Sequence, residues 1–124
     1  MSESILTSVK KLIGPEHEET HFDPDIIMHI NAAISILTQL GIGPEEGFVI
    51  ENADATWEDF IDDDKRLSGV KLYVYMKVKL VFDPPVSAAT IASMEGQIKE
   101  YEWRANEVRE NDLIKVKKGE IQNG

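Results

Sequence analysis

The stretch that decides the fold is residues 67–110. It reads LSGVKLYVYMKVKLVFDPPVS from 67 to 87 and AATIASMEGQIKEYEWRANEVRE from 88 to 110. An apolar segment dotted with lysines stops at Asp83-Pro84-Pro85. Because proline lacks an amide hydrogen and has a fixed φ, neither a helix nor a central strand continues through Pro84 and Pro85. Ser87 can cap a new helix behind this stop, so the stretch predicts two long elements joined by a diproline hinge.

The element before the hinge, residues 70–82, fits two kinds of structure. The segment fits a helix in which Lys71, Lys77 and Lys79 extend their charged ends to solvent. On the other hand, its apolar residues alternate with their neighbours, and this alternation taken alone favours a strand. The alternating residues are Val70, Leu72, Val74, Met76, Val78, Leu80 and Phe82.

The element after the hinge, residues 87–110, is predicted to be a helix. Trp103 points about 170° away from its apolar seam at 100° per residue, on the side of Ala92 and Gly96. Small residues permit the close approach of a second backbone. We therefore predict that Ala92, Gly96 and Trp103 form a helix contact or a subunit interface, within the fold or with another copy. The seam itself has the three-and-four spacing of a helix–helix contact, at Ile91, Met94, Ile98, Tyr101, Ala105 and Val108.

The first half of the chain predicts two helices and a helical turn. Residues 2–13 have an amphipathic pattern, and residues 24–40 have a wide apolar face with Asp23 as the N-cap. Residues 55–60 fit a helical turn whose aromatic side chains face inward.

Length and composition limit the class of protein. At 124 residues the chain is one domain with a modest core. It contains no Cys, which excludes disulfides and thiolate metal sites, and its apolar runs are too short to span a bilayer. We therefore expect a soluble protein of a reducing compartment that does not bind membranes.

The charge is unevenly distributed. Residues 1–64 carry 2 Lys and 15 Asp or Glu, whereas residues 65–124 carry 11 Lys or Arg and 8 Asp or Glu. Residues 45–64 hold nine acids and no base. Such a segment cannot bind phosphate backbones, which Lys and Arg capture. It either keeps the protein soluble or faces something that the protein must not hold.

Residues 17–21 match the H-E-x-x-H pattern of zinc proteases. That chemistry needs both histidines on one face of a helix and a third ligand beyond them. Here the five residues lie between Pro15 and Pro24, with room for barely two turns, and no convincing third ligand follows. We therefore predict a polar loop without zinc, and a chain with no catalytic residues and no cofactor.

Residues 70–109 resemble the head-tail connector (adaptor) proteins of long-tailed bacteriophages. The matching features are YMKVKLVF at 75–82, the Asp83-Pro84-Pro85 hinge and QIKEYEWR at 97–104. The first half agrees in layout, with a short helix, a polar loop and an Ile-rich helix that ends in Leu-Gly-Ile-Gly-Pro. The resemblance covers about 70% of the chain, and its motifs are structural rather than catalytic.

The resemblance implies a mainly α fold: a small helical bundle with a long C-terminal helix and an extended C-terminal tail. In that family the segment before the diproline is a helix, so we assign residues 70–82 to a helix. The connector domain would be residues 1–111 and the tail residues 112–124. Family members are not enzymes. Their copies assemble as a ring, usually of twelve, beneath the portal protein, where the ring extends the DNA channel and supports the downstream neck (stopper) protein.

Three sets of residues become candidate sites on this view. Ala92, Gly96 and Trp103 would contact another helix or subunit. An acidic set would face the channel or solvent, since acids repel the phosphates of passing DNA without binding it specifically; it comprises Glu45, Glu46, Asp62, Asp63 and Asp64. The tail would bind the portal through Leu113, Ile114, Lys115, Val116, Lys117 and Lys118.

The expected location is the neck of the virion, at the portal vertex, after assembly in the host cytoplasm. A second class of function stays open from the residues alone. A small helical regulator or antitoxin-like module would also bind another protein, and it would form a small closed oligomer, most often a dimer.

Overall fold

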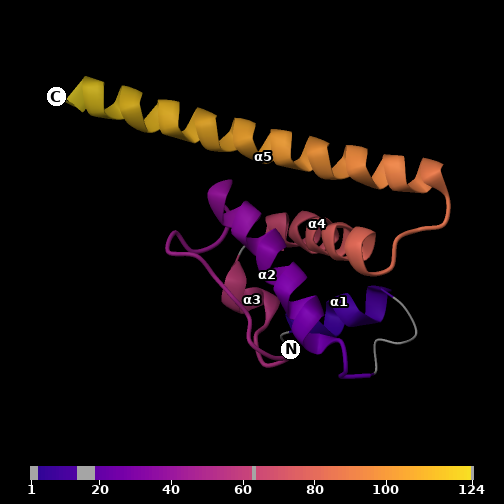
Figure 1. Cartoon of the computed structure of the whole chain (residues 1–124). Coiled ribbons are helices and arrows are strands. Elements are labelled where there is room, and N and C mark those ends of the chain that lie inside the picture. Colours follow the sequence, from indigo (N-terminus) through magenta and orange to yellow (C-terminus); the bar gives the residue numbers. More distant parts are fainter. Residues whose placement is uncertain (1–2, 14–18, 63, 124) are drawn as a thin grey trace.

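The computed structural model describes residues 3–13, 19–62 and 64–123. These residues form five helices and no multi-residue strand, as Figure 1 shows. The helices are α1 (Ile5–Ile13), α2 (Asp23–Gln39), α3 (Trp57–Phe60), α4 (Asp64–Phe82) and α5 (Ala88–Asn123). The prediction of a mainly α bundle with a long C-terminal helix is confirmed.

Helix α4 lies in the middle of the structure. It packs against α1 and α2 on one side and against α5 on the other (Figure 1). Val70, Val74 and Val78 are fully buried at helical spacing, and Met76 is also buried. A helix that is covered on two sides needs apolar residues around much of its circumference. Burial on two sides thus gives residues 70–82 much of the alternation of a strand although they form a helix; Leu72, which is 48% exposed, is the exception.

The contact between α4 and α5 is built on a glycine and two tyrosines. Gly69 lets the Tyr101 ring come close, because a Cβ at this position would lie 3.0 Å from Tyr101 Cε2. The rings of Tyr73 and Tyr101 stack with centroids 5.1 Å apart. The Tyr73 hydroxyl donates a hydrogen bond of 2.6 Å to Glu102 Oε2. Burial, followed by this hydrogen bond, raises the pKa of Tyr73 above its ordinary value.

The acidic segment between α2 and α4 is held at both ends. The Asn31 side chain forms two hydrogen bonds with the backbone of Ile50. Its Nδ2 donates to Ile50 O (3.0 Å), and its Oδ1 accepts from Ile50 N (2.8 Å). Trp57, buried in the core, donates from Nε1 to Ser8 Oγ at 2.9 Å. Thr56 caps α3 in a capping box with Asp59. The long connection is therefore an ordered part of the body.

Two details differ from the sequence-based expectations. The Asp23 carboxylate forms an ion pair with Lys10 Nζ at 2.6 Å, which ties α2 to α1, and Phe22 occupies the N-cap position without a side-chain cap. The C-terminal segment is also not extended: α5 continues as a helix to Asn123. Residues 112–118 contain no Pro and no Gly, so nothing in them stops the helix.

Gly43 provides the first test of this fold. Its φ of +83° is rarely adopted by other residues, and an added Cβ would lie 2.4 Å from Phe60 Cε1. We expect Gly43→Ala to lower the free energy of unfolding by about 2–4 kcal/mol in urea denaturation, through backbone strain and overpacking.

Gly47→Ala is the matched control, because its φ is +96° but no atom lies within 4 Å of an added Cβ. It should cost only the backbone strain, about 1–2 kcal/mol. Equal losses in the two variants would contradict the close packing of Gly43 on Phe60.

The Tyr73 hydroxyl provides a second test. A Tyr whose pKa is raised in the folded state contributes stability that is complete below its unfolded pKa, near 10, and is lost as the pH rises further. We expect Tyr73→Phe to cost about 1–3 kcal/mol at neutral pH, because it removes a hydrogen bond to a carboxylate. The difference in unfolding free energy between wild type and variant should shrink above pH 10.

Tyr75→Phe is the control for this experiment. The Tyr75 hydroxyl has no hydrogen-bond partner in the described part of the chain. Its removal should leave stability nearly unchanged, and a loss as large as that of Tyr73→Phe would contradict the assigned role of the Tyr73–Glu102 bond.

Candidate assembly surface

Helix α5 is much longer than the body that it packs on. Its 36 residues extend for about 54 Å, and its C-terminal part continues past the other helices (Figure 1). The aliphatic part of Arg109 lies against Gly41, where an added Cβ would be 3.4 Å from Arg109 Cδ. Beyond this point Leu113, Ile114 and Val116 are each at least half exposed. The end of α5 thus presents apolar side chains that the body does not cover.

The outward face of α5 carries the three residues predicted to make a helix contact. Trp103 is 63% exposed, Ala92 is exposed, and no atom lies within 4 Å of an added Cβ at Gly96. All three residues are thus exposed, and the described part of the subunit makes no tight contact with them. Their contact with another copy stays a prediction.

The inward seam of α5 packs largely as the spacing predicts. Met94 and Ile98 are buried, and Tyr101 and Ala105 pack partly buried on the core. Leu72 and Met76 of α4 line a shallow hollow together with Tyr101. Val108 departs from the pattern because it is half exposed at the point where α5 begins to leave the body.

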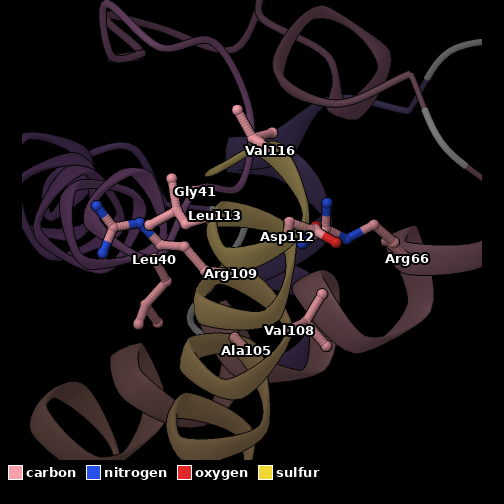
Figure 2. A pocket seen from close by; sticks show the side chains of 9 residues that line it. All are labelled: Leu40, Gly41, Arg66, Ala105, Val108, Arg109, Asp112, Leu113 and Val116. Atoms are coloured by element: carbon pink, nitrogen blue, oxygen red, sulfur yellow. The ribbon is translucent and has the colours of Figure 1, made fainter. Parts of the chain in front are cut away.

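Two neighbouring hollows lie where α5 passes the ends of α2 and α4, and they share Arg66, Ala105 and Val108 in their lining. We call them together the α5 groove. Their volumes are about 190 and 320 Å³. Figure 2 shows Arg66 and Arg109 on either side of α5 around the first hollow. The lining of the groove consists of Leu40, Gly41, Ile42, Lys65, Arg66, Gly69, Tyr101, Arg104, Ala105, Val108, Arg109, Asp112, Leu113 and Val116.

This groove is the feature that sequence reasoning missed. Its apolar floor and its basic residues come from three separate segments, so no local pattern marks it. The available signal was that all three arginines of the chain, Arg66, Arg104 and Arg109, lie in its basic second half. Arg104 also pairs with Glu100 of its own helix at 2.7 Å.

The predicted acidic residues lie on the surface wherever the structure describes them. Glu45 and Glu46 are exposed in the loop after α2, and Asp62 is exposed after α3. Asp63 lies outside the described residues, as does the side chain of Asp64. Among the described tail residues, Lys115 and Lys117 are exposed, whereas the side chain of Lys118 is not described.

The zinc-protease pattern falls partly outside the described residues, since His17 and Glu18 are not among them. His21 is described, and its ring packs edge-on against Phe22. In the described part of the chain no group of three or more His, Asp or Glu could hold a metal ion. None of the described helices combines the length and the apolar character needed to cross a bilayer.

Comparison with protein-family models gives one informative match. A model described as "Phage connector protein" matches residues 5–112, which include α1 to α4 and the part of α5 that packs on the body. Comparison with curated proteins and with solved structures gives no match.

Trp103 tests whether the outward face of α5 is used in assembly. Because its side chain is mostly exposed, Trp103→Ala should leave the melting temperature within a few degrees of wild type. The same change should weaken self-association measured by sedimentation velocity, since exposed Trp residues often anchor protein interfaces.

Trp57→Ala is the contrasting variant. Trp57 is only 1% exposed, and its truncation should cost about 3–5 kcal/mol of folding stability. If Trp103→Ala self-associates and enters particles as well as wild type does, the outward face is not an interface.

Proposed function

Because this chain belongs to the phage connector protein family, we propose that its copies form a ring beneath the portal protein, where the ring joins capsid to tail and extends the DNA channel. The family match over residues 5–112 carries this proposal. The family is one of structural proteins, and the chain is accordingly a structural connector component of a phage. The finer assignment, to the neck at the portal vertex after assembly in the host cytoplasm, is part of the proposal, which involves no catalytic step and no cofactor.

A ring subunit needs surfaces for its neighbours in addition to a folded core. The outward face of α5 is suited to such a contact. Trp103 is exposed on the same face as Ala92 and Gly96, and it contributes little to the subunit's own core. We propose that this face lies against an adjacent copy. A ring of about twelve copies is our expectation from the family.

We further propose that residues 1–111 form the ring body and that residues 112–124 form an arm that binds the portal. The arm is a helix with Leu113, Ile114 and Val116 exposed and with Lys115 and Lys117 beside them; Lys118 would add a further charge. Apolar side chains with surrounding lysines suit a groove with an acidic rim. Repeated around a ring, individually weak arms would bind firmly, because each bound arm raises the effective concentration of the next.

The acidic surface suits a channel through which DNA must pass without being held. Exposed carboxylates repel phosphates over roughly 8 Å at physiological salt. We propose that part of the acidic set, among Glu45, Glu46, Asp62, Asp63 and Asp64, faces this channel. The opposite end of the ring would then support the downstream stopper protein.

Truncation tests the proposed arm. A chain that ends at Glu110 should remain folded, because the buried core lies before this residue. We expect it to melt within a few degrees of wild type and to lose its attachment to portal-bearing capsids in a co-sedimentation assay.

Two controls sharpen the test. Leu113→Asp/Ile114→Asp keeps the full length of the chain but removes the apolar character of the arm, so it should fail in the same way. Capsids without portal should bind no wild-type chain. Full occupancy of portal-bearing capsids by the truncated chain would show that attachment lies on the body.

A further inference from the structure

The α5 groove has an apolar floor and a basic rim. Leu40, Val108 and Leu113 contribute apolar surface, and Arg66 and Arg109 lie on either side of α5 (Figure 2). Asp112 is the only carboxylate in the described lining of the two hollows. A groove of this kind suits an apolar side chain that is flanked by acids.

The chain itself carries such an element on the connection between α2 and α3. Val49 is 66% exposed, and it lies between the exposed Glu46 and Glu51. Its neighbours Phe48 and Ile50 turn inward: Phe48 packs on Phe60 with ring centroids 5.3 Å apart, and Ile50 is buried. Val49 therefore stays exposed, and it lines a shallow hollow with Ser35 of α2.

The segment is also held rigidly. Asn31 binds both backbone groups of Ile50, at 2.8 and 3.0 Å. A fixed loop loses less conformational entropy when it binds than a free loop does. Val49 with Glu46 and Glu51, which we call the acidic knob, is thus prepared for a complementary partner.

The acidic knob and the α5 groove are two separate surfaces of the subunit, because no residue lines both of them. Glu46 and Val49 lie in a hollow beside the end of α2 at Gln39, whereas the groove begins with Leu40, directly after this helix. Two complementary surfaces that do not overlap make a head-to-tail contact, and such contacts generate rings when the rotation closes.

We propose that the acidic knob of one copy docks into the α5 groove of the next copy. The inference rests on the proposed ring and specifies which surfaces close it. Val49 enters between Leu40 and Val108, while Glu46 and Glu51 face Arg66 and Arg109. Part of the acidic stretch then serves the contact between copies, and Asp62, Asp63 and Asp64 remain for the channel.

Charge reversal on each surface tests this contact. Glu46→Lys/Glu51→Lys reverses the knob, and Arg66→Glu/Arg109→Glu reverses the groove. Each variant alone should self-associate at least about tenfold more weakly than wild type in sedimentation velocity, because like charges then meet at the contact.

A mixture of the two variants gives the decisive result. The knob variant keeps a basic groove, which can bind the acidic knob that the groove variant keeps. The reversed knob carries lysines and the reversed groove carries glutamates, so these two surfaces also attract one another. An equimolar mixture should therefore recover the wild-type assembly in alternating order. Glu19→Lys/Glu58→Lys, with the same change of net charge at exposed positions outside both surfaces, should associate as wild type does.

Circular dichroism and melting check that each variant is folded. If the groove reversal does not fold, Arg66→Gln/Arg109→Gln replaces it and should also weaken association. Wild-type protein that stays monomeric at millimolar concentration, a knob variant that assembles normally, or a mixture no larger than its components would overturn the proposal. Binding of the wild-type chain to portal-bearing capsids tests the proposed function separately. The contact between copies and the proposed function can therefore fail independently of one another.

Discussion

The burial of α4 on two sides is the constraint on which the rest of the structure depends. One side of this helix closes the core with α1 and α2, and among the described helices the other side is the one on which α5 mainly packs. Gly69 and the stacked Tyr73 and Tyr101 decide how closely α5 can approach. The diproline hinge then reverses the chain, so that α5 runs back along α4 and must pass beyond it, because α5 is nearly twice as long (36 against 19 residues).

This length difference separates the residues that fold the subunit from those that remain for partners. Among the described residues, the buried cluster ends with Ile98, and Ala105 is the last that packs partly buried on it. Later apolar residues, such as Leu113 and Ile114, contribute little to folding because they stay exposed. Exposed apolar groups on a helix with no partner in its own chain indicate an interaction surface. The fold thus provides a self-sufficient body and a projecting helix that an assembly can use.

Sequence patterns predicted the helices that are covered on one side. They failed where contacts between distant segments of the chain determine the structure. The sequence predicted the seam of α5 because its apolar residues face a single neighbouring helix and therefore keep the three-and-four spacing. The alternation in residues 70–82 favoured a strand, and only the family resemblance assigned the helix, since double burial removes the helical signature. The face of Trp103 followed from helical geometry, but its exposure did not, because exposure depends on what covers the helix. The α5 groove was missed because Leu40, Arg66 and Arg109 meet only in the folded chain.

The uneven distribution of charge would have a physical role in an assembly of several copies. Within one subunit, the acids of the knob and the arginines of the groove form no ion pair in the described part of the chain. Between neighbouring copies the same groups would meet at contact distance, where attraction selects the head-to-tail orientation and opposes stacking of like surfaces. Each contact can then be modest, because closing a ring adds one contact without a further loss of translational freedom.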